Sequence, residues 1–353
     1  MEPSPERPSS ASAVLPDLWY YALPSRWLKP GRMVAKTLLG QPLLFARTTD
    51  GEAFALVDIC PHRGIPLRYG RFDGNEVECC YHGWRFDRAG RCTLIPSLVE
   101  GQDFDPGRIK ARRVKLAERQ GNIWIFSGRE DAADTIAVPE LPAIGAAGAR
   151  IVERVLFPCH VDHAVVGLMD PAHGPFVHRS WWWRRASSIH AKEKRYAASE
   201  LGFSMVRHPP SRNSALYRIL GGGLSTEIAF RLPGVRIEHI QAGRYTLVGL
   251  TTVTPIDETQ TELHHLIYWT APWLTPMRAL LRPVARTFLN QDRDIVIKQQ
   301  DGLRHAPALM LINDADVPAK WYYRLRREWA SSRAERRTFV NPVPAETLLR
   351  WRS

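Results

Sequence analysis

Several features that mark other classes of protein are missing from this 353-residue sequence. It has no uninterrupted apolar run of the roughly 18 residues that a membrane-spanning helix needs. Residues 1–13 are rich in proline and serine and lack the apolar core of a signal peptide. We therefore expect a cytoplasmic protein without a transmembrane segment. With 44% hydrophobic and 24% charged residues, the composition is that of a globular chain of about two domains.

Cysteine is scarce, and its few occurrences are uneven. The chain has five cysteines, an odd number, and four of them fall within residues 60–92. In a chain expected to be intracellular, such cysteines more often serve metals or chemistry than disulfides. A metal centre is therefore expected in this segment, and we do not expect a disulfide framework.

Acidic residues are outnumbered by basic ones, which gives a formal net charge of +12. The basic residues are densest between Lys320 and Arg337. Such a balance favours acidic partners, of which nucleic acid and an acidic redox protein are two candidates. An ordinary solvated basic helix accounts for the same pattern, so the charge does not decide between these hypotheses.

Short strands separated by glycine-containing turns are predicted between Leu18 and Ser127. Apolar or alternating runs place these strands at residues 33–38, 42–46, 53–57, 76–80 and 122–126. This pattern is typical of a small all-β domain. Residues 129–148, with prolines and several small residues, are interpreted as a linker at the start of the next domain.

The rest of the chain mixes longer strands with helices. Strands are predicted at residues 151–157, 226–232, 235–240, 245–254 and 262–270, and helices near residues 162–170 and 277–300. The second domain is therefore expected to be an antiparallel sheet with helices packed on it, and the whole chain to be α+β. We expect a disordered N-terminus at residues 1–16, a first domain at 17–128 and a second domain at 129–353.

Two short motifs in the first domain carry metal-binding side chains. Cys60 and His62 form a C-x-H motif, and Cys79 and His82 form a C-x-x-H motif. Two thiolates and two imidazoles suit either a tetrahedral zinc ion or a 2Fe-2S cluster with cysteines on one iron and histidines on the other. The order of the ligands favours the cluster, because zinc sites more often pair their cysteines locally as C-x-x-C.

The two motifs resemble the cluster-binding loops of Rieske non-haem iron oxygenases, the family of the aromatic ring-hydroxylating dioxygenase α-subunits. They read Cys-Pro-His-Arg-Gly from residue 60 and Cys-Cys-Tyr-His-Gly-Trp from residue 79. The resemblance implies that Cys60, His62, Cys79 and His82 bind a 2Fe-2S cluster. Ile65 stands where respiratory Rieske proteins carry an additional cysteine, so the resemblance implies a cluster of low potential, on the order of −150 mV.

A second metal motif, D-x-x-H-x-x-x-x-H, runs from Asp170 to His178. His173 and His178 are five residues apart and would diverge by about 140° on a regular helix. Gly174 and Pro175 interrupt the helix and allow both imidazoles to reach one metal. Two histidines with one carboxylate leave open positions on Fe(II) for O₂. The alternative is a pair of unrelated surface histidines.

The resemblance to Rieske oxygenases extends to this motif. It implies that His173 and His178 bind a mononuclear Fe(II), that Asp170 links the two metal sites, and that a carboxylate of a late helix completes the iron site. Asp170 precedes His173 by three residues, so we expect its carboxylate to accept a hydrogen bond from the outer ring nitrogen of that histidine. Helical phase favours Asp292, which shares its face with Phe288, Leu289, Ile295, Val296 and Gln299. The other candidate, Asp294, is expected to face water together with Asn290, Gln291, Lys298 and Asp301.

The resemblance implies a terminal oxygenase that uses O₂ to hydroxylate an organic substrate. Monooxygenation, dioxygenation and oxidative demethylation stay open. Electrons are expected from a ferredoxin, an NAD(P)H-dependent reductase or both, because no nicotinamide- or flavin-binding G-x-G-x-x-G unit occurs in the chain. Arg63 and Arg85 are candidates for contact with an acidic ferredoxin, against the alternative of ordinary solvated charges. A homotrimer is implied, in which Asp170 meets His82 of a neighbouring subunit, and no nucleic acid partner is expected.

The substrate is the least specified part of the prediction. Trp181, Trp182 and Trp183 either line the cavity or pack in a core or subunit interface, and Arg184 and Arg185 are interpreted as exposed. We expect a small, largely apolar aromatic or polycyclic compound. A function of another class is also considered, namely a Rieske electron-transfer or lipid-like ligand-binding protein without oxygenase activity.

Overall fold

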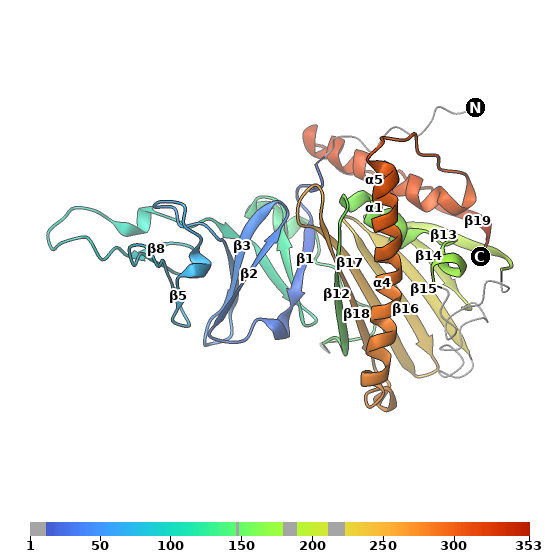
Figure 1. Cartoon of the computed structure of the whole chain (residues 1–353), viewed down its shortest axis with the longest axis horizontal. Helices are drawn as coiled ribbons and strands as arrows, with labels where there is room; N and C mark the ends of the chain where they lie inside the picture. Colours follow the sequence, from blue (N-terminus) through green and yellow to red (C-terminus); the bar gives the residue numbers. More distant parts are fainter. Residues whose placement is uncertain (1–11, 146–147, 179–188, 211–222) are drawn as a thin grey trace. The chain divides into compact units, whose positions relative to one another are not determined.

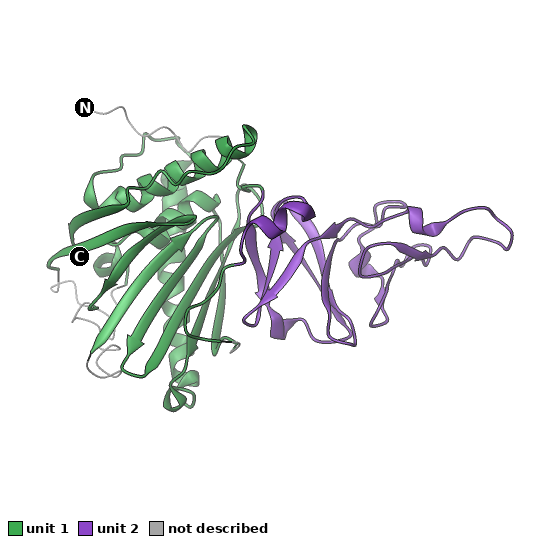
Figure 2. Cartoon of the chain, turned by 180° about the vertical axis from the view of Figure 1, so that it is seen from behind, with its two compact units in different colours: residues 1–16, 139–353 green, residues 17–138 purple. Residues whose placement is uncertain are grey.

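The computed structural model describes residues 12–145, 148–178, 189–210 and 223–353 (Figure 1). They divide into two compact units (Figure 2). The N-terminal unit is Asp17–Val138, and the C-terminal unit combines Pro139–Ser353 with the residues up to Pro16. The boundary lies ten residues beyond the expected one because the 3-10 helix Glu130–Thr135, with its buried Ala133, is part of the N-terminal unit.

The N-terminal unit consists of three small antiparallel sheets. Their strand orders are β1-β11-β10, β2-β3-β4-β9 and β5-β6-β7-β8. The strands are β1 (Trp19–Pro24), β2 (Arg32–Leu38), β3 (Gln41–Arg47), β4 (Ala53–Val57), β5 (Arg71–Phe72), β6 (Val77–Glu78), β7 (Arg85–Phe86), β8 (Cys92–Leu94), β9 (Arg113–Val114), β10 (Leu116–Arg119) and β11 (Asn122–Phe126). Short 3-10 helices also occur at Ser25–Trp27, Leu67–Tyr69 and Pro106–Arg108. An all-β unit is thus confirmed.

The core of this unit surrounds the two motif cysteines. Leu44, Phe54 and Phe86 are fully buried and belong to one apolar cluster that also contains Cys60 and Cys79. The expected strand at residues 76–80 is shortened to Val77–Glu78, because the Cys79 amide donates to the carbonyl of Trp84 in a loop instead of extending the ladder. Packing of apolar strands thereby fixes the base of both metal-binding loops.

The C-terminal unit is built on one antiparallel sheet of eight strands, in the order β12-β18-β17-β16-β15-β14-β13-β19. The strands are β12 (Ile151–Phe157), β13 (Ala191–Ser199), β14 (Gly202–His208), β15 (Leu224–Arg231), β16 (Val235–Ala242), β17 (Tyr245–Pro255), β18 (Thr261–Trp269) and β19 (Glu346–Arg352). Among the described residues the helices are α1 (Val161–Met169), α2 (Gly174–Val177), α4 (Arg278–Leu303) and α5 (Val317–Ala334), with 3-10 turns at Pro272–Leu274 and Asp314–Asp316. The expected α+β class is confirmed.

Helices α1, α4 and α5 cover one face of this sheet, which we call the inner face (Figures 1 and 2). Ile267 and Trp269 of β18 pack with Ala285 of α4. The ring of Trp321 in α5 lies 5.7 Å from that of Tyr196 in β13, measured between centroids. Because side chains alternate along a strand, every second residue of each strand points toward these helices.

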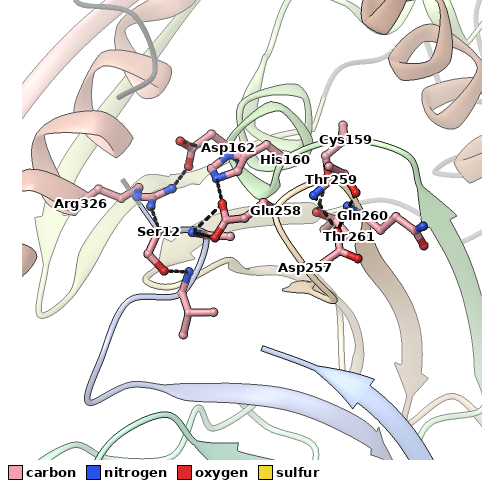
Figure 3. Close-up of polar contacts among 12 residues, drawn as sticks. Ser12, Cys159, His160, Asp162, Asp257, Glu258, Thr259, Gln260, Thr261 and Arg326 are labelled. Carbon is pink, nitrogen blue, oxygen red and sulfur yellow. Dashed lines mark hydrogen bonds and ion pairs between the residues drawn. The ribbon is translucent and has the colours of Figure 1, made fainter. Parts of the chain in front are cut away.

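Helix α5 fixes α1 through a buried ion pair (Figure 3). Arg326 pairs with Asp162 of α1, and the Tyr322 hydroxyl donates to the same carboxylate at 2.6 Å. Arg326 and Asp162 are 6% and 3% exposed, so the pair is held within the core. The basic stretch from Lys320 is therefore not simply a solvated helix. One face of it is buried and holds the helix that leads into the second metal motif.

Residues 12–16 also pack on the C-terminal unit, although a disordered N-terminus was expected to extend to residue 16. Ala13 and Leu15 are buried, and the Ala13 amide donates to a carboxylate oxygen of Glu258 at 3.1 Å. Arg326 donates to the carbonyl of Ser12 at 2.6 Å (Figure 3). The expectation was wrong for these five residues because their apolar side chains and amides find partners that the local sequence does not reveal. Residues 1–11 lie outside the described part of the chain.

Candidate metal centres

The two cysteine–histidine loops of the N-terminal unit share one backbone design. In each loop the cysteine amide donates to the carbonyl five residues later, Ile65 in the first loop and Trp84 in the second, both at 2.8 Å. In each loop a glycine amide also donates back to the cysteine carbonyl, at 2.9 and 3.0 Å. These glycines, Gly64 and Gly83, have φ angles of +75° and +70°, which L-residues with side chains rarely adopt.

The loops bring all four candidate cluster ligands together. The rings of His62 and His82 lie 4.6 Å apart, and His62 stacks on Trp84 at 4.2 Å, both between ring centroids. Both cysteines are 2% exposed, and burial, together with the neighbouring Cys79 thiol, raises the pKa of Cys60 to about 11. The Nδ1 atom of His82 is buried without a hydrogen-bond partner among the described residues. Two adjacent thiols and an unpaired ring nitrogen fit a bound cluster, whose positive irons would favour thiolates and occupy that nitrogen.

The surface next to these histidines is less basic than the sequence suggested. Arg85 is already paired with Glu78 at 2.9 Å, which leaves it little net charge to offer a partner. Arg63 lies over the ring of exposed Tyr81, at 5.8 Å from its centroid. Cys80 is exposed and lies outside the apolar cluster that holds Cys60 and Cys79.

The second candidate site joins three side chains of the C-terminal unit. The Nε2 atoms of His173 and His178 are 3.2 Å apart, and Asp292 Oδ1 lies 3.3 Å from His178 Nε2 and 3.7 Å from His173 Nε2. These three donor atoms form a group in which all lie within 4.8 Å of one another. Two imidazoles and one carboxylate aimed at one point fit a facial metal site with open positions.

The break between α1 and α2 lets both histidines reach this point. Helix α1 ends at Met169, before Pro171, and α2 begins after His173, so the two histidines flank a helix of one turn, His173 at its N-cap and His178 at its C-cap. His178 is 1% exposed and its ring stacks on Phe288 of α4 at 3.5 Å between centroids. The break lies at residues 170–173, earlier than the interruption expected at Gly174 and Pro175, and these two residues instead begin α2, where a proline in the first turn is tolerated.

Asp170 holds His173 in a different way from the one expected. The main-chain carbonyl of Asp170 lies 2.8 Å from His173 Nδ1, whereas its carboxylate oxygen Oδ2 is 3.7 Å away. The other carboxylate oxygen accepts from the Ala172 amide at 2.7 Å, which turns the side chain back onto its own loop. The expected carboxylate–imidazole hydrogen bond within the chain is therefore replaced by a carbonyl–imidazole bond.

Helix α4 presents Asp292 to the histidines and Asp294 to solvent, as its phase predicted. Two details of that phase were wrong. Ile295 and Gln299 are exposed, and Gln291, expected to face water, has its amide oxygen 3.1 Å from His178 Nδ1. Gln291 and Asp292 are adjacent on α4, so their side chains point about 100° apart around the helix axis. Both nevertheless reach His178, because the imidazole lies between these two directions. The signal in the sequence that could have predicted the role of Gln291 is its polar amide side chain directly before the predicted ligand Asp292.

Burial shapes the electrostatics of this site. Desolvation raises the pKa of Asp292 to about 7, and the guanidinium of Arg236 acts in the opposite direction. Desolvation also lowers the pKa of His173. A bound cation would reverse the shift in the pKa of Asp292, because it stabilises the carboxylate, and it would lower the pKa of His173 further, because a metal ligand must be a neutral imidazole. The tryptophans at 181–183 and the arginines at 184 and 185 lie outside the described residues.

Family models match most of both units. Residues 18–112 match the Rieske [2Fe-2S] domain, and residues 157–331 match the vanillate O-demethylase oxygenase C-terminal domain. With the geometry above, these matches define a Rieske-type protein, and the N-terminal unit is a 2Fe-2S domain. The chain belongs to the Rieske oxygenase family. None of the helices within the described ranges combines the length and apolar character that crossing a bilayer would require.

Two curated relatives illustrate the similarity. The 4β-methylsterol monooxygenase of Methylococcus capsulatus is 37% identical over 36% of this chain and 34% of its own length. The oxygenase component of dicamba O-demethylase from Stenotrophomonas maltophilia is 33% identical over 46% of this chain and 47% of its own length. The chain thus aligns with less than half of the length of these relatives.

The fold extends further than the sequence alignments. A crystal structure of dicamba monooxygenase bound to dicamba superposes with a TM-score of 0.74 at 22% identity, covering 92% of this chain and 100% of that chain. A structure of the Pseudomonas putida protein NdmA with caffeine superposes with a TM-score of 0.67 at 20% identity, covering 90% and 91% of the two chains. At these identities the likeness concerns the fold alone.

Proposed function

We propose that this protein is the terminal oxygenase component of a Rieske system, which uses O₂ to hydroxylate a small organic substrate. The observation that carries the proposal is the convergence of His173, His178 and Asp292 on one point. These side chains would hold a mononuclear Fe(II), which activates O₂ when bound. Gln291 and the carbonyl of Asp170 orient the two imidazoles by accepting from their outer nitrogens, which fixes the tautomers that bind metal through Nε2.

In the same proposal Cys60, His62, Cys79 and His82 hold the 2Fe-2S cluster that supplies electrons. Asp170 connects the two centres: its Oδ1 atom accepts from the Ala172 amide of its own loop, and its Oδ2 atom would accept from the cluster histidine of a neighbouring subunit. Such an arrangement requires a closed ring, and we propose a homotrimer. The geometry of Asp170 supports this role, because its Oδ2 atom lies 3.7 Å from His173 Nδ1 and forms no hydrogen bond with that imidazole.

The electron donor is proposed to be a ferredoxin, an NAD(P)H-dependent reductase or both. The chain has no dinucleotide-binding G-x-G-x-x-G unit, and two relatives are named as an oxygenase component and an oxygenase subunit. Arg63, exposed beside the cluster histidines, is the better candidate for docking an acidic donor, since Arg85 is neutralised by Glu78.

We propose residues 17–138 as the limits of the cluster domain and residues 139–353 as the limits of the iron domain.

The substrate is proposed to be a largely apolar aromatic or polycyclic compound. The relatives are named for a sterol, chlorophyllide, phthalate and dicamba, so ring systems recur but polar groups differ. Monooxygenation, dioxygenation and demethylation are all represented by these names. A Rieske protein that only carries electrons or binds a lipid-like ligand is the competing function.

An isotope experiment separates these functions. The protein is reduced anaerobically in the presence of an aromatic methyl ether, a polycyclic hydrocarbon or a sterol, and ¹⁸O₂ is then admitted. Mass spectrometry is expected to find one ¹⁸O atom per product for monooxygenation and two for dioxygenation, and loss of the methyl group for demethylation. Asp292→Ala protein with an intact cluster is the control. Oxidation of the cluster without labelled product for any compound would favour the electron-transfer function.

A further inference from the structure

The inner face of the large sheet carries a polar group at its centre, where a sheet covered by helices is usually apolar. Arg236 of β16 stands opposite Thr251 of β17, which in turn stands opposite His265 of β18. Glu238 lies two residues further along β16, on the same face. The rung that contains Arg236 also contains Phe230, whose ring lies 5.8 Å from that of Tyr322 in α5, so these side chains point toward the helices.

Arg236 and Glu238 form an ion pair. The Nη2 atom of Arg236 donates to Glu238 Oε2 at 3.2 Å, and the two side chains are 19% and 22% exposed. Within the described ranges this is the one polar contact of the guanidinium, which therefore has N–H groups left for a ligand. Partial exposure in the middle of an eight-stranded sheet means that solvent reaches the inner face at this point.

The chain leaves room beside this pair. Gly249 of β17 stands opposite Glu238 and opposite Ile267, and a Cβ atom there would lie 3.5 Å from His265 and 3.8 Å from Glu238. The absence of a side chain keeps the surface between Glu238 and His265 open. His265 Nδ1 is 2.8 Å from the Thr251 hydroxyl, and burial lowers the pKa of His265 to about 4, so the imidazole is neutral at pH 7.

This polar group lies near the proposed iron site. Gly234, two residues before Arg236, packs against α1, since a Cβ atom at Gly234 would lie 3.3 Å from the side chain of Val165. Helix α1 ends at Met169 and leads directly into Asp170 and His173. A ring compound that contacts Arg236 on the inner face therefore has the end of α1 and the triad within its reach.

The opposite charges of Arg236 and Glu238 indicate which functional group of a substrate this pair would bind. A carboxylate that approached Arg236 would also face Glu238, and at about 4 Å and an effective dielectric constant near 20 this repulsion is about 4 kcal/mol, as large as the attraction. Lys194, a further cation of the inner face, is three strands away and donates to the carbonyl of Pro209 at 3.4 Å. A hydroxyl group meets no such penalty, because it both donates and accepts hydrogen bonds.

We propose that the substrate carries an uncharged hydroxyl group, which accepts a hydrogen bond from Arg236 and donates one to Glu238 while the ring skeleton extends toward His173, His178 and Asp292. This inference rests on the proposed oxygenase function and narrows its substrate class to neutral, hydroxylated ring compounds. Arg236 and Glu238 are then the residues that determine specificity. Apolar surface of the substrate supplies affinity, and the ion pair selects its orientation.

Calorimetric titration of the metal-containing protein tests the proposal without turnover. Naphthalene and a saturated steroid skeleton, each bearing a hydroxyl, a carboxylate or a methyl group at one position, serve as probes. The wild-type protein is expected to bind the hydroxyl compound of at least one skeleton ten times or more tighter than its carboxylate and methyl counterparts. Preference for the carboxylate, or binding of no hydroxyl compound, would overturn the proposal.

Two variants and one matched control sharpen the result. Glu238→Gln leaves Arg236 uncompensated and should shift the preference toward the carboxylate by at least tenfold, whereas Arg236→Gln should weaken hydroxyl binding by about tenfold and leave methyl binding unchanged. Glu227→Gln is the control, because Glu227 pairs with Arg207 at the same 3.2 Å on the opposite face of the sheet. Equal selectivity in Glu238→Gln and the control would refute the proposal.

The proposed oxygenase function and the proposed hydroxyl-binding pair can be refuted independently of each other. Hydroxyl selectivity in calorimetry without ¹⁸O in any product would refute the oxygenase function while supporting this binding group. Labelled product from a carboxylate or a simple hydrocarbon, with no effect of Glu238→Gln on its KM, would refute the binding group while supporting the oxygenase function.

Discussion

The two candidate metal centres are built in opposite ways. The cluster site comes from two loops within residues 60–84, each closed by its own pair of backbone hydrogen bonds. The iron site comes from the two ends of α2 and from α4, and its contact between His178 and Gln291 joins residues 113 apart in the sequence. One centre is local and shaped by backbone geometry, whereas the other depends on the packing of distant helices.

This difference has a consequence for what each site tolerates. Each cluster loop needs a glycine with positive φ and a buried cysteine at its base, so the residues it requires lie together in one short motif of the sequence. The iron site needs α1 and α4 in the right positions, and the position of α1 is held by residues far from the ligands, such as Asp162 and its partner Arg326 of α5. Substitutions at either centre can show whether the two are independent.

The largest effect is expected at the ligand that α4 contributes. Asp292→Ala should remove the mononuclear iron and essentially all turnover, because two imidazoles alone form an incomplete site. Asp294→Ala, on the exposed side of the same helix, should keep both. Iron analysis alongside the visible spectrum of the cluster measures the two centres separately. Loss of iron from Asp294→Ala instead would show that the ligand had been assigned to the wrong aspartate.

Asp170→Asn is expected to separate the centres without emptying either. The asparagine oxygen can still accept from the Ala172 amide, and the main-chain carbonyl still meets His173, so both metals should stay bound. Without the negative charge, reduction of the cluster should support product formation at only a small fraction of the wild-type rate. Single-turnover assays measure this. Normal turnover, or a fully active monomer in sedimentation, would contradict the proposed link between subunits.

Gln291→Leu should weaken the iron site by a smaller factor. Loss of a group that orients a metal-binding histidine typically costs 10- to 100-fold in metal affinity, and Gln291 is the α4 residue whose amide oxygen faces His178 Nδ1. Asn290→Leu, one position earlier on the exposed side, is the matched control. Titration of the metal-free proteins with Fe(II) under anaerobic conditions compares them. Equal affinities would mean that Gln291 does not support the imidazole.

The smallest effect is expected at Cys80. Cys80→Ser should keep the colour and spectrum of the cluster, because the exposed Cys80 lies outside the buried cluster of residues that holds Cys60 and Cys79. Cys79→Ser, its neighbour, should lose the spectrum entirely. A folded but colourless Cys80→Ser protein would show that the second loop binds through the other cysteine.

The features that could be predicted from the sequence are the local ones, and those that depend on contacts between distant residues could not. The cluster loops, the α+β class and strands such as β4, β11 and β12 could be predicted because their patterns are short and contiguous. The edge strand β19 could not, since it pairs with β13 across 149 to 161 residues of sequence and has no distinctive alternation. Residues 12–16 likewise gave no local indication that Glu258 and Arg326 would bind them.

Within the iron site the sequence predicted types of residue better than their contacts. A helix break next to His173 and the inward direction of Asp292 followed from proline chemistry and helical phase, although the break lies at residues 170–173 and not at Gly174. The carbonyl of Asp170 replaced its carboxylate beside His173 because a side chain that can satisfy the Ala172 amide locally turns back to it. Gln291 was expected to face water since periodicity distinguishes the faces of a helix but not which edge meets a neighbour.

The distance along the chain between the two parts of the iron site also sets an order of assembly. During synthesis the N-terminal end emerges first, and contacts between distant residues must wait for the intervening chain. Residues 60–84 and the sheets around them are complete once residue 138 has emerged, whereas Asp292 and the stabilising α5 are made more than 150 residues later. The loops for the cluster can thus mature on the ribosome, while the iron-binding pocket can close only near the end of translation.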